Sequence, residues 1–356
     1  MTAPADLRAA AERGAAALGV PFPLIQAGMG GVAGPALAAA VSGAGALGTV
    51  ALYKSDAALA AALVDDTAAR TDRTFSVNVI PEVADRLLDA QIAAVLDRAD
   101  RRIAVNSYGL PPERTAAAVL AAGHRLIVQT GSTADARAAA GLGAHAVVVQ
   151  GVQAGGHHLG GQPLEELLAD AAGVGVPVFA AGAVATGRDL AEAVRRGASG
   201  ALCGTLFVAA AESAAHPDYK AALTAARAAD TVVTERFSIG WPGRPHRVLR
   251  SPVTESAEPL PAALIAWTTV MGTRRPVPRG SAAAPTAEAE GLVGEMARYA
   301  GLGCGAVTAV EPAAAVVGRL RAEFAAALGG GPAGAPVPVA PVPGAPVPAG
   351  PVPAER

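Results

Sequence analysis

Short runs rich in Val and Ile alternate with longer Ala-rich stretches from residue 24 to residue 205. Runs that are apolar on both faces are typical of parallel strands covered by helices. They recur about every 25 to 30 residues, which is the spacing of strand–helix units. Eight such units predict an α/β fold in which the strands close into a (β/α)8 TIM barrel. The runs are Leu24–Met29, Ala46–Leu52, Thr74–Ile80, Ile103–Tyr108, Arg125–Thr130, Ala146–Gly151, Val176–Gly182 and Gly200–Thr205.

The stretches between these runs have the amphipathic pattern of helices. We expect residues 20–205 to form the barrel, with the helices outside the strands. The expected helices are Pro35–Ser42, Ala57–Ala69, Val83–Arg98, Pro112–Ala122, Ala134–Ala140, Leu164–Ala172 and Gly187–Arg196.

The alternation stops after this region, and the rest of the chain divides into three parts. Residues 206–310 are expected to form an inserted helical subdomain over the barrel mouth, including a helix over 286–300. A helix at 311–328 is expected to close the barrel. Residues 329–356 are rich in Pro, Ala, Val and Gly. This composition removes amide donors, so it predicts a disordered C-terminal tail without a catalytic role.

Composition and charge exclude several functional classes. The net charge of −2 and the aromatic content of 3% give no basis for binding nucleic acid or an anionic membrane. Cys203 and Cys304 have no CxxC spacing, so neither a disulfide scaffold nor a metal site is expected. Residues 1–17 contain charged side chains and no continuous apolar run, so we expect no signal peptide. A reducing, cytoplasmic environment fits these features.

Residues Gly43–Gly48 match the dinucleotide-binding pattern GxGxxG in their letters. That fingerprint requires the glycines to follow a strand and open a helix. Here they end the helix expected at Pro35–Ser42 and precede a strand, where glycine commonly caps a helix. We therefore interpret this match as structural.

The loop after the sixth run, residues 150–161, carries five glycines around two adjacent histidines. Gly155 and Gly156 would let the main chain pass close to a ligand. A histidine beside them can exchange a proton near neutral pH. The alternative is a flexible loop with surface histidines. We favour a catalytic His157, because it directly follows the two glycines.

Two further segments have both a structural and a functional interpretation. Gly28 and Met29 end the first run at the edge where barrel enzymes hold their active sites. They form either a plain turn or a surface for a flat ring. Asn78 is a polar residue in an apolar run. It is either a satisfied core amide or a hydrogen-bond partner of a ring edge, and Gln129 is a weaker case of the same kind.

The loops after the seventh and eighth runs commonly hold a phosphate in barrel enzymes. Small residues follow both runs here: Gly182 and Ala183 after one, Gly204 and Thr205 after the other. Backbone amides and a hydroxyl would make the contacts. The alternative is barrel closure by small residues. Cys203 fits a packing role better than that of a nucleophile.

Several segments together resemble the nitronate monooxygenase (2-nitropropane dioxygenase) family. They are PLIQAGMGG (23–31), SVNVI (76–80), QGVQAGGHHLG (150–160), ARYAGLGCGAV (297–307), FSIGWPGRPHRVLRS (237–251) and the long stretch over 176–213. The resemblance covers about residues 20 to 325. It implies an FMN-binding barrel with an added helical domain.

The resemblance also implies roles for individual residues. His157 matches the family's active-site histidine, and the remaining positions match flavin contacts: Gly28, Met29, Asn78, Gln150, Gly155, Gly156, Gly182, Ala183, Cys203, Gly204 and Thr205. The chain departs from the family pattern at Gln153, where Glu is common, at Leu159, which delays the following glycine, and at Ala183. These departures bear on the substrate and on the geometry of the histidine.

The implied reaction is the oxidation of alkyl nitronates, or of nitroalkanes, by O2 to a carbonyl compound and nitrite. His157 would supply a proton or a positive partner to the nitro group, or take a proton from a neutral nitroalkane. One alternative is a flavin-type enoyl-acyl carrier protein reductase that uses NAD(P)H. Another is a non-catalytic barrel that binds flavin or a phosphorylated ligand. The physiological substrate and the oligomeric state are left open.

Overall fold

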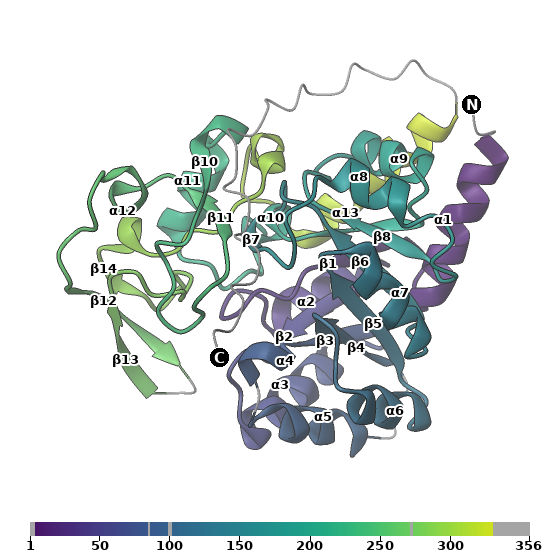
Figure 1. The fold of residues 1–356 in the computed structure, drawn as a ribbon, viewed down its shortest axis with the longest axis horizontal. Coiled ribbons are helices and arrows are strands. Elements are labelled where there is room, and N and C mark those ends of the chain that lie inside the picture. The colour runs from purple at the N-terminus through teal and green to yellow at the C-terminus, as the bar shows by residue number, and fades with distance from the viewer. Residues whose placement is uncertain (1–3, 85, 99–101, 271–272, 330–356) are drawn as a thin grey trace, which may run out of the picture.

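Eight parallel strands form the closed barrel at the centre of the molecule (Figure 1). The computed structural model describes residues 4–84, 86–98, 102–270 and 273–329. The sheet closes beside the first strand, where the Gln26 N–H donates to the Leu47 carbonyl at 2.9 Å and the Leu47 N–H donates to the Leu24 carbonyl at 2.8 Å. The strands are β1 (Leu24–Gln26), β2 (Gly48–Ala51), β3 (Phe75–Val79), β4 (Ile103–Tyr108), β5 (Arg125–Thr130), β6 (Ala146–Gln150), β8 (Val178–Ala181) and β9 (Gly200–Cys203).

Both faces of the barrel strands are buried, as their continuous apolar runs predict. In β6, Ala146 and Val148 point into the barrel, whereas Val147 and Val149 pack on the surrounding helices. Helix α1 (Pro4–Leu18) covers the end of the barrel opposite the site, and its Leu18 joins the interior cluster. The sequence analysis did not anticipate this helix.

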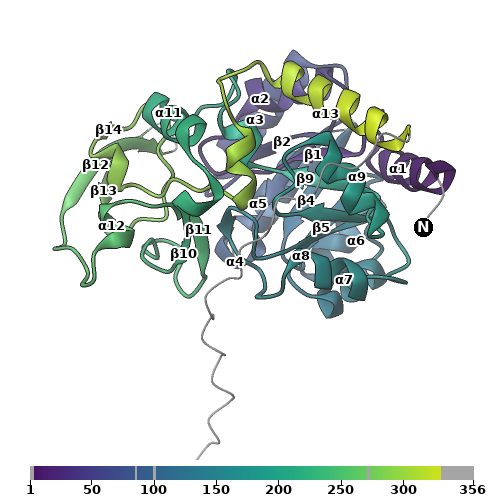
Figure 2. The same cartoon turned by 90° about the horizontal axis from the view of Figure 1, so that it is seen from above.

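Helices outside the strands complete the barrel. They are α2 (Pro35–Gly43), α3 (Ala57–Arg70), α4 (Pro81–Ala84), α5 (Leu88–Leu96), α6 (Glu113–Ala121), α7 (Thr133–Gly141), α8 (Leu164–Asp170), α9 (Gly187–Arg195) and α13 (Ala313–Leu328). The stretch expected as one helix over 83–98 contains the end of α4 and all of α5. Helix α13 packs between α9 and α2 and so fills the last position of the ring (Figure 2).

The segment 206–310 differs from the expected helical subdomain, because it contains two antiparallel sheets as well as short helices. Strands β10 (Thr231–Thr234) and β11 (His246–Leu249) form a sheet with β7 (Gly156–His157), which comes from the loop after β6. A second sheet contains β12 (Leu264–Val270), β13 (Thr273–Pro278) and β14 (Glu290–Gly291). The helices of the segment are short: α10 (Thr205–Val208), α11 (Pro217–Ala225) and α12 (Pro252–Glu255).

The helix expected over 286–300 is likewise not formed. Its buried residues follow one another at helix-like intervals: Ala289, Val293, Met296, Ala297 and Ala300. Gly291, however, has a φ of 123°, which no helix allows, and it packs against the Ile265 backbone. The segment therefore runs as short irregular turns whose spacing imitates an amphipathic helix.

Two expectations concern the surroundings of the fold. None of the helices in the described ranges combines the length and the apolar character needed to cross a bilayer. The tail expected to be disordered, 329–356, lies outside the described residues except for Gly329.

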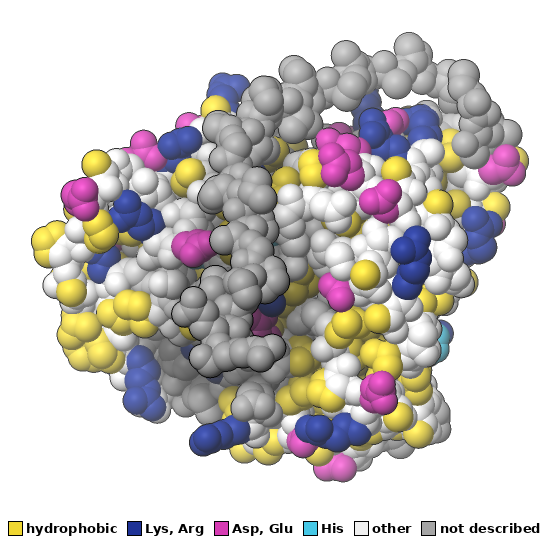
Figure 3. All heavy atoms as spheres, in the orientation of Figure 1, with side chains coloured by type: hydrophobic (Ala, Val, Ile, Leu, Met, Phe, Trp, Pro, Cys, Tyr) yellow, Lys and Arg dark blue, Asp and Glu magenta, His cyan; other side chains and the backbone are white. Residues whose placement is uncertain are grey.

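Figure 3 shows hydrophobic side chains gathered at the edge of the molecule where β12 to β14 lie.

Candidate active site

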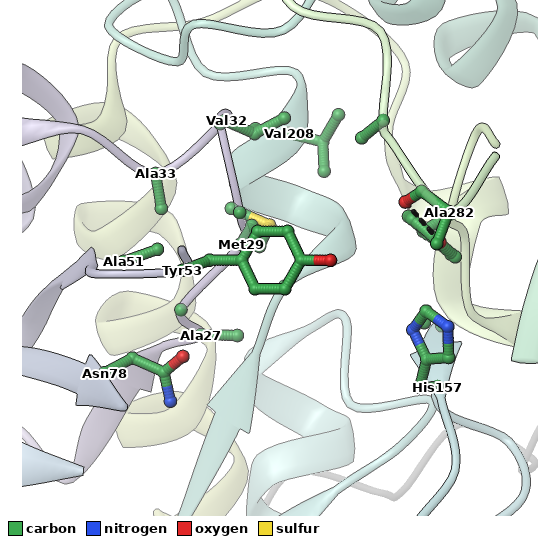
Figure 4. A pocket seen from close by; sticks show the side chains of 18 of the residues that line it. Ala27, Met29, Val32, Ala33, Ala51, Tyr53, Asn78, His157, Val208 and Ala282 are labelled. Carbon is green, nitrogen blue, oxygen red and sulfur yellow. Dashed lines mark hydrogen bonds between the residues drawn. The ribbon is translucent and has the colours of Figure 1, made fainter. Parts of the chain in front are cut away.

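A cavity of about 520 Å³ opens at the carboxyl ends of the barrel strands and is partly covered by the added segment (Figure 4). This is the face at which barrel enzymes hold their active sites. All twelve residues that the sequence analysis selected line this cavity: Gly28, Met29, Asn78, Gln150, Gly155, Gly156, His157, Gly182, Ala183, Cys203, Gly204 and Thr205. The structure therefore brings together segments that are up to 177 residues apart (205 − 28 = 177).

The backbone of His157 is fixed from two sides. Strand β7 pairs it with His246 of β11. On the barrel side, its carbonyl accepts hydrogen bonds from the Tyr108 hydroxyl at 2.6 Å and the Gln150 side-chain amide at 2.9 Å. The side-chain oxygen Oε1 of Gln150 in turn accepts a hydrogen bond from the Leu159 N–H at 3.0 Å. The Gln150 side chain thus binds the histidine loop at both His157 and Leu159.

The imidazole of His157 faces the cavity in a largely apolar environment. Its ring lies parallel to the Trp241 indole, with centroids 3.9 Å apart. The Nε2 atom is buried and has no hydrogen-bond partner within the described ranges. Burial, assisted by the neighbouring His246, lowers the pKa of His157 to about 3. The ring is therefore neutral near pH 7 and supplies no positive charge.

His158 occupies a different environment from its neighbour. Its Nε2 atom is 2.9 Å from the Ala154 carbonyl oxygen, and the ring is buried away from the cavity. Burial lowers the pKa of His158 to about 4. The two adjacent histidines point in different directions, and His157 is the one that lines the cavity.

The loops after β8 and β9 form a cradle of unpaired amides. Gly182 has a φ of 127° and Ala183 a φ of 55°, both in the left-handed region. The N–H groups of Gly182, Ala183, Gly204 and Thr205 find no acceptor in the described part of the chain. The Thr205 hydroxyl accepts from the Gly301 N–H at 3.0 Å, which ties this cradle to the added segment. Unpaired amides on the loops after two adjacent strands suit an anion such as a phosphate.

Cys203 is a packing residue at the edge of this cradle. Its thiol donates to the Val184 carbonyl at 3.1 Å, and burial raises its pKa to about 12. A thiol held in this way is a poor nucleophile.

The ends of β1 and β3 form a close-packed wall of the cavity. A Cβ at Gly28 would lie 2.4 Å from Cγ of Asn78, so only glycine allows this approach. The Asn78 amide nitrogen donates to the Asn106 carbonyl at 3.2 Å. Its carbonyl oxygen has no donor among the residues that the structure describes and is free to accept from a ligand. The cradle, the wall and the orphaned histidine nitrogen together fit a planar cofactor that ends in a phosphate.

Aromatic residues that the sequence analysis gave no role also line the cavity. They are Tyr53, Tyr108, Trp241 and Tyr299. Tyr108 ends strand β4, a position that the rule for barrel active sites could have identified. Trp241 lies in the segment quoted for the family resemblance, but nothing in the sequence indicates that its indole covers His157.

Gln153, a departure from the family pattern, has a structural role outside the cavity lining. Its amide donates to Glu165 at 2.9 Å, and its carbonyl accepts from the Leu164 N–H at 3.0 Å at the start of α8. Gln153 therefore helps to hold the start of the helix that follows the loop.

The closed barrel, the amide cradle and the buried histidine at its carboxyl edge fit a flavin-dependent oxidoreductase. Comparison with known proteins specifies the family. The chain belongs to the nitronate monooxygenase family, whose model matches residues 12–323.

The individual relatives carry different names. A nitronate monooxygenase from Pseudomonas aeruginosa is 34% identical over 291 residues, which cover 68% of this chain and 82% of the relative. A (3aS,4S,5R,7aS)-5-hydroxy-7a-methyl-1-oxo-octahydro-1H-indene-4-carboxyl-CoA dehydrogenase from Mycobacterium tuberculosis is 36% identical and covers 68% of this chain and 66% of its own length. The solved nitroalkane oxidase from Streptomyces ansochromogenes superposes with a TM-score of 0.70 at 29% identity and covers 88% of this chain and 98% of its own.

Proposed function

We propose that the protein binds FMN and catalyses the oxidation of alkyl nitronates by O2 to a carbonyl compound and nitrite. The observation that carries this proposal is the buried, unpaired Nε2 of His157 on the cavity that also contains the amide cradle. When bound, the flavin supplies the electron transfer between the substrate and O2. The family to which the chain belongs supports the same reaction.

In this proposal, His157 acts as a general base. Its neutral imidazole accepts the α-proton of a neutral nitroalkane at Nε2, which yields the nitronate within the site. A substrate that arrives as a nitronate needs no such step, and His157 then orients the nitro group. Tyr108 and Gln150 hold the backbone of His157, and Trp241 keeps water from its ring.

The cradle supports FMN rather than FAD. The unpaired N–H groups of Gly182, Ala183, Gly204 and Thr205 line the cavity on the loops after two adjacent strands, which suits one phosphate group. Residues Gly43–Gly48 match a dinucleotide fingerprint in sequence. In the structure they form the end of α2 and the turn into β2, and Gly45 adopts a φ of 88° in that turn. In this fold they lie outside the cavity lining.

The test of this function is an oxygen-uptake assay on the purified flavoprotein. We expect O2 consumption and nitrite formation with alkyl nitronates in the absence of NAD(P)H. Strict dependence on NAD(P)H, or retention of flavin without turnover, would refute the proposal.

The relative named as a carboxyl-CoA dehydrogenase supports a second candidate, the oxidation or reduction of an acyl thioester. The same cradle and histidine would serve that reaction with another substrate. Activity with acyl-CoA or acyl carrier protein thioesters and a nicotinamide cofactor, combined with inactivity toward nitronates, would establish it.

A further inference from the structure

The cavity has an unusual balance of charges. Among its described lining residues, the charged side chains are Lys54 and Arg275, and there is no carboxylate. A ligand that enters this space therefore meets positive charge without a compensating negative one. Such a cavity favours anions.

Lys54 is held in a conformation that its residue type disfavours. It has a φ of 56°, in the left-handed region that normally requires glycine or asparagine. Its side chain is half-buried, and Nζ lies 5.0 Å from the centroid of the Tyr53 ring. No hydrogen bond or ion pair joins this ammonium to another residue in the described ranges. Backbone strain of this kind is typical of sites under functional constraint.

Arginines of the added segment contrast with this lysine. Arg244 pairs with Glu82 at 2.9 Å, Arg274 with Glu290 at 2.7 Å and Arg279 with Glu295 at 2.7 Å. The two cations that line the cavity have no carboxylate within salt-bridge distance in the described part of the chain. Their charge is consequently available to a ligand.

Two aromatic rings, those of Tyr53 and Trp241, lie between Lys54 and the imidazole of His157 in a series of contacts. The Lys54 ammonium faces Tyr53, Tyr53 stacks on Trp241 at 6.1 Å, and Trp241 stacks on His157 at 3.9 Å. Figure 4 shows the Tyr53 ring projecting into the cavity, with its hydroxyl toward the side on which His157 lies. The proposed phosphate donors, by contrast, are uncharged backbone groups on the loops after β8 and β9, so the cofactor phosphate does not require this lysine.

We propose that Lys54 recognises the negative charge of the substrate and makes the site selective for organic anions, such as alkyl nitronates, over their neutral parent compounds. Arg275 of β13 adds a second positive charge at the exposed side of the cavity. This inference rests on the proposed function for the identity of the substrate. Lys54 is needed for anion binding because the neutral ring of His157 supplies no charge.

The experiment compares Lys54→Met and Lys54→Arg with the wild-type holoenzyme. Arg274→Gln is the matched control, because this arginine neighbours Arg275 but is paired and lies outside the cavity lining. Each protein is assayed with propyl-2-nitronate and with neutral 2-nitropropane. Nitrate, a planar anion that resembles a nitro group, is titrated separately and its binding is followed by the flavin absorbance.

We expect Lys54→Met to raise KM for the nitronate and Kd for nitrate by about tenfold or more. The KM for the neutral nitroalkane should rise less than the KM for the nitronate, because only the nitronate is charged when it binds. Lys54→Arg should retain anion binding, and Arg274→Gln should behave as the wild type. Equal losses with both substrates, unchanged nitrate affinity or loss of flavin in Lys54→Met would overturn the proposal. If the wild type oxidises no nitronate, the proposed function fails, while the nitrate titration still decides whether Lys54 binds anions.

Discussion

The indole of Trp241 lies parallel to the imidazole of His157, with ring centroids 3.9 Å apart and an interplanar angle of 18°. This contact excludes water from one face of the histidine. Because the charged form of an imidazole loses more hydration than the neutral form, burial of this kind lowers its pKa. Trp241 should therefore set the range of pH over which His157 can act as a base.

Replacement of Trp241 by Ala is expected to raise the pKa of His157 from about 3 toward its ordinary value of 6.5. The base works only when it is neutral, so the acidic limb of kcat/KM for a neutral nitroalkane should move to higher pH. Trp241→Phe retains a stacked ring and should shift the limb less. The measurement is a pH profile of kcat/KM, and coincident limbs in the wild type and Trp241→Ala would contradict this role.

His157→Asn should reduce turnover of a neutral nitroalkane by about 10²- to 10⁴-fold while flavin stays bound. His158→Asn should cost little turnover, because its ring contacts the Ala154 carbonyl and lies outside the cavity lining. Steady-state kinetics and flavin content measure both effects. An inactive His158→Asn together with an active His157→Asn would mean that the roles are reversed.

Acid should destabilise the fold through the same histidines. The folded pKa values of His157 and His158, about 3 and about 4, lie below their ordinary value of 6.5. Between these limits the unfolded chain binds more protons than the folded chain, so stability is fully present above about pH 6.5 and declines as pH falls. Thermal unfolding of the holoenzyme at pH 7 and pH 5 tests this. The decline in Tm should be smaller in His157→Asn, and an equal decline would argue against a depressed pKa.

Gly182→Ala should weaken flavin binding. The φ of 127° at this position is strained for any residue with a Cβ, and the added atom would lie 3.1 Å from the Ala154 nitrogen. The backbone strain at this position costs roughly 1–3 kcal/mol. When that strain is present only in the flavin-bound form, the affinity for flavin falls by about five- to a hundredfold. Ala183→Gly is the control, since it relaxes a left-handed residue in the same loop. Flavin Kd by fluorescence and identification of the released flavin complete the test, and release of FAD would refute the proposed cofactor.

Deletion of residues 330–356 should leave flavin content and turnover nearly unchanged. The segment is rich in Pro, Ala, Val and Gly, and such a sequence buries too little surface to form a core. A substantial loss of either property in the truncated protein would show that the tail contributes to the site.

The barrel could be predicted closely because its strands are buried on both faces and leave a continuous apolar signal. Strands β4 and β5 have the bounds that the sequence predicts. The added segment could not. Strand β13 is largely exposed and leaves no continuous apolar signal, and Thr286–Ala300 places apolar residues at helical intervals around Gly291. Within the site, glycine spacing and barrel position identified the lining residues. The stacking of Trp241 and the unpaired ammonium of Lys54 depend on contacts between distant segments, which no local pattern encodes.

His157 lies on β7, a strand that departs from the barrel loop and pairs with β11 of the added segment. The barrel holds the same residue through Tyr108 and Gln150. Neither the barrel nor the added segment alone therefore supplies all the contacts that position this histidine. In a chimera that takes residues 206–310 from a relative, the contacts with β11 would come from one parent and those with Tyr108 and Gln150 from the other. Recombination within this family should preserve function only when the loop 150–161 and the strand 246–249 come from the same parent.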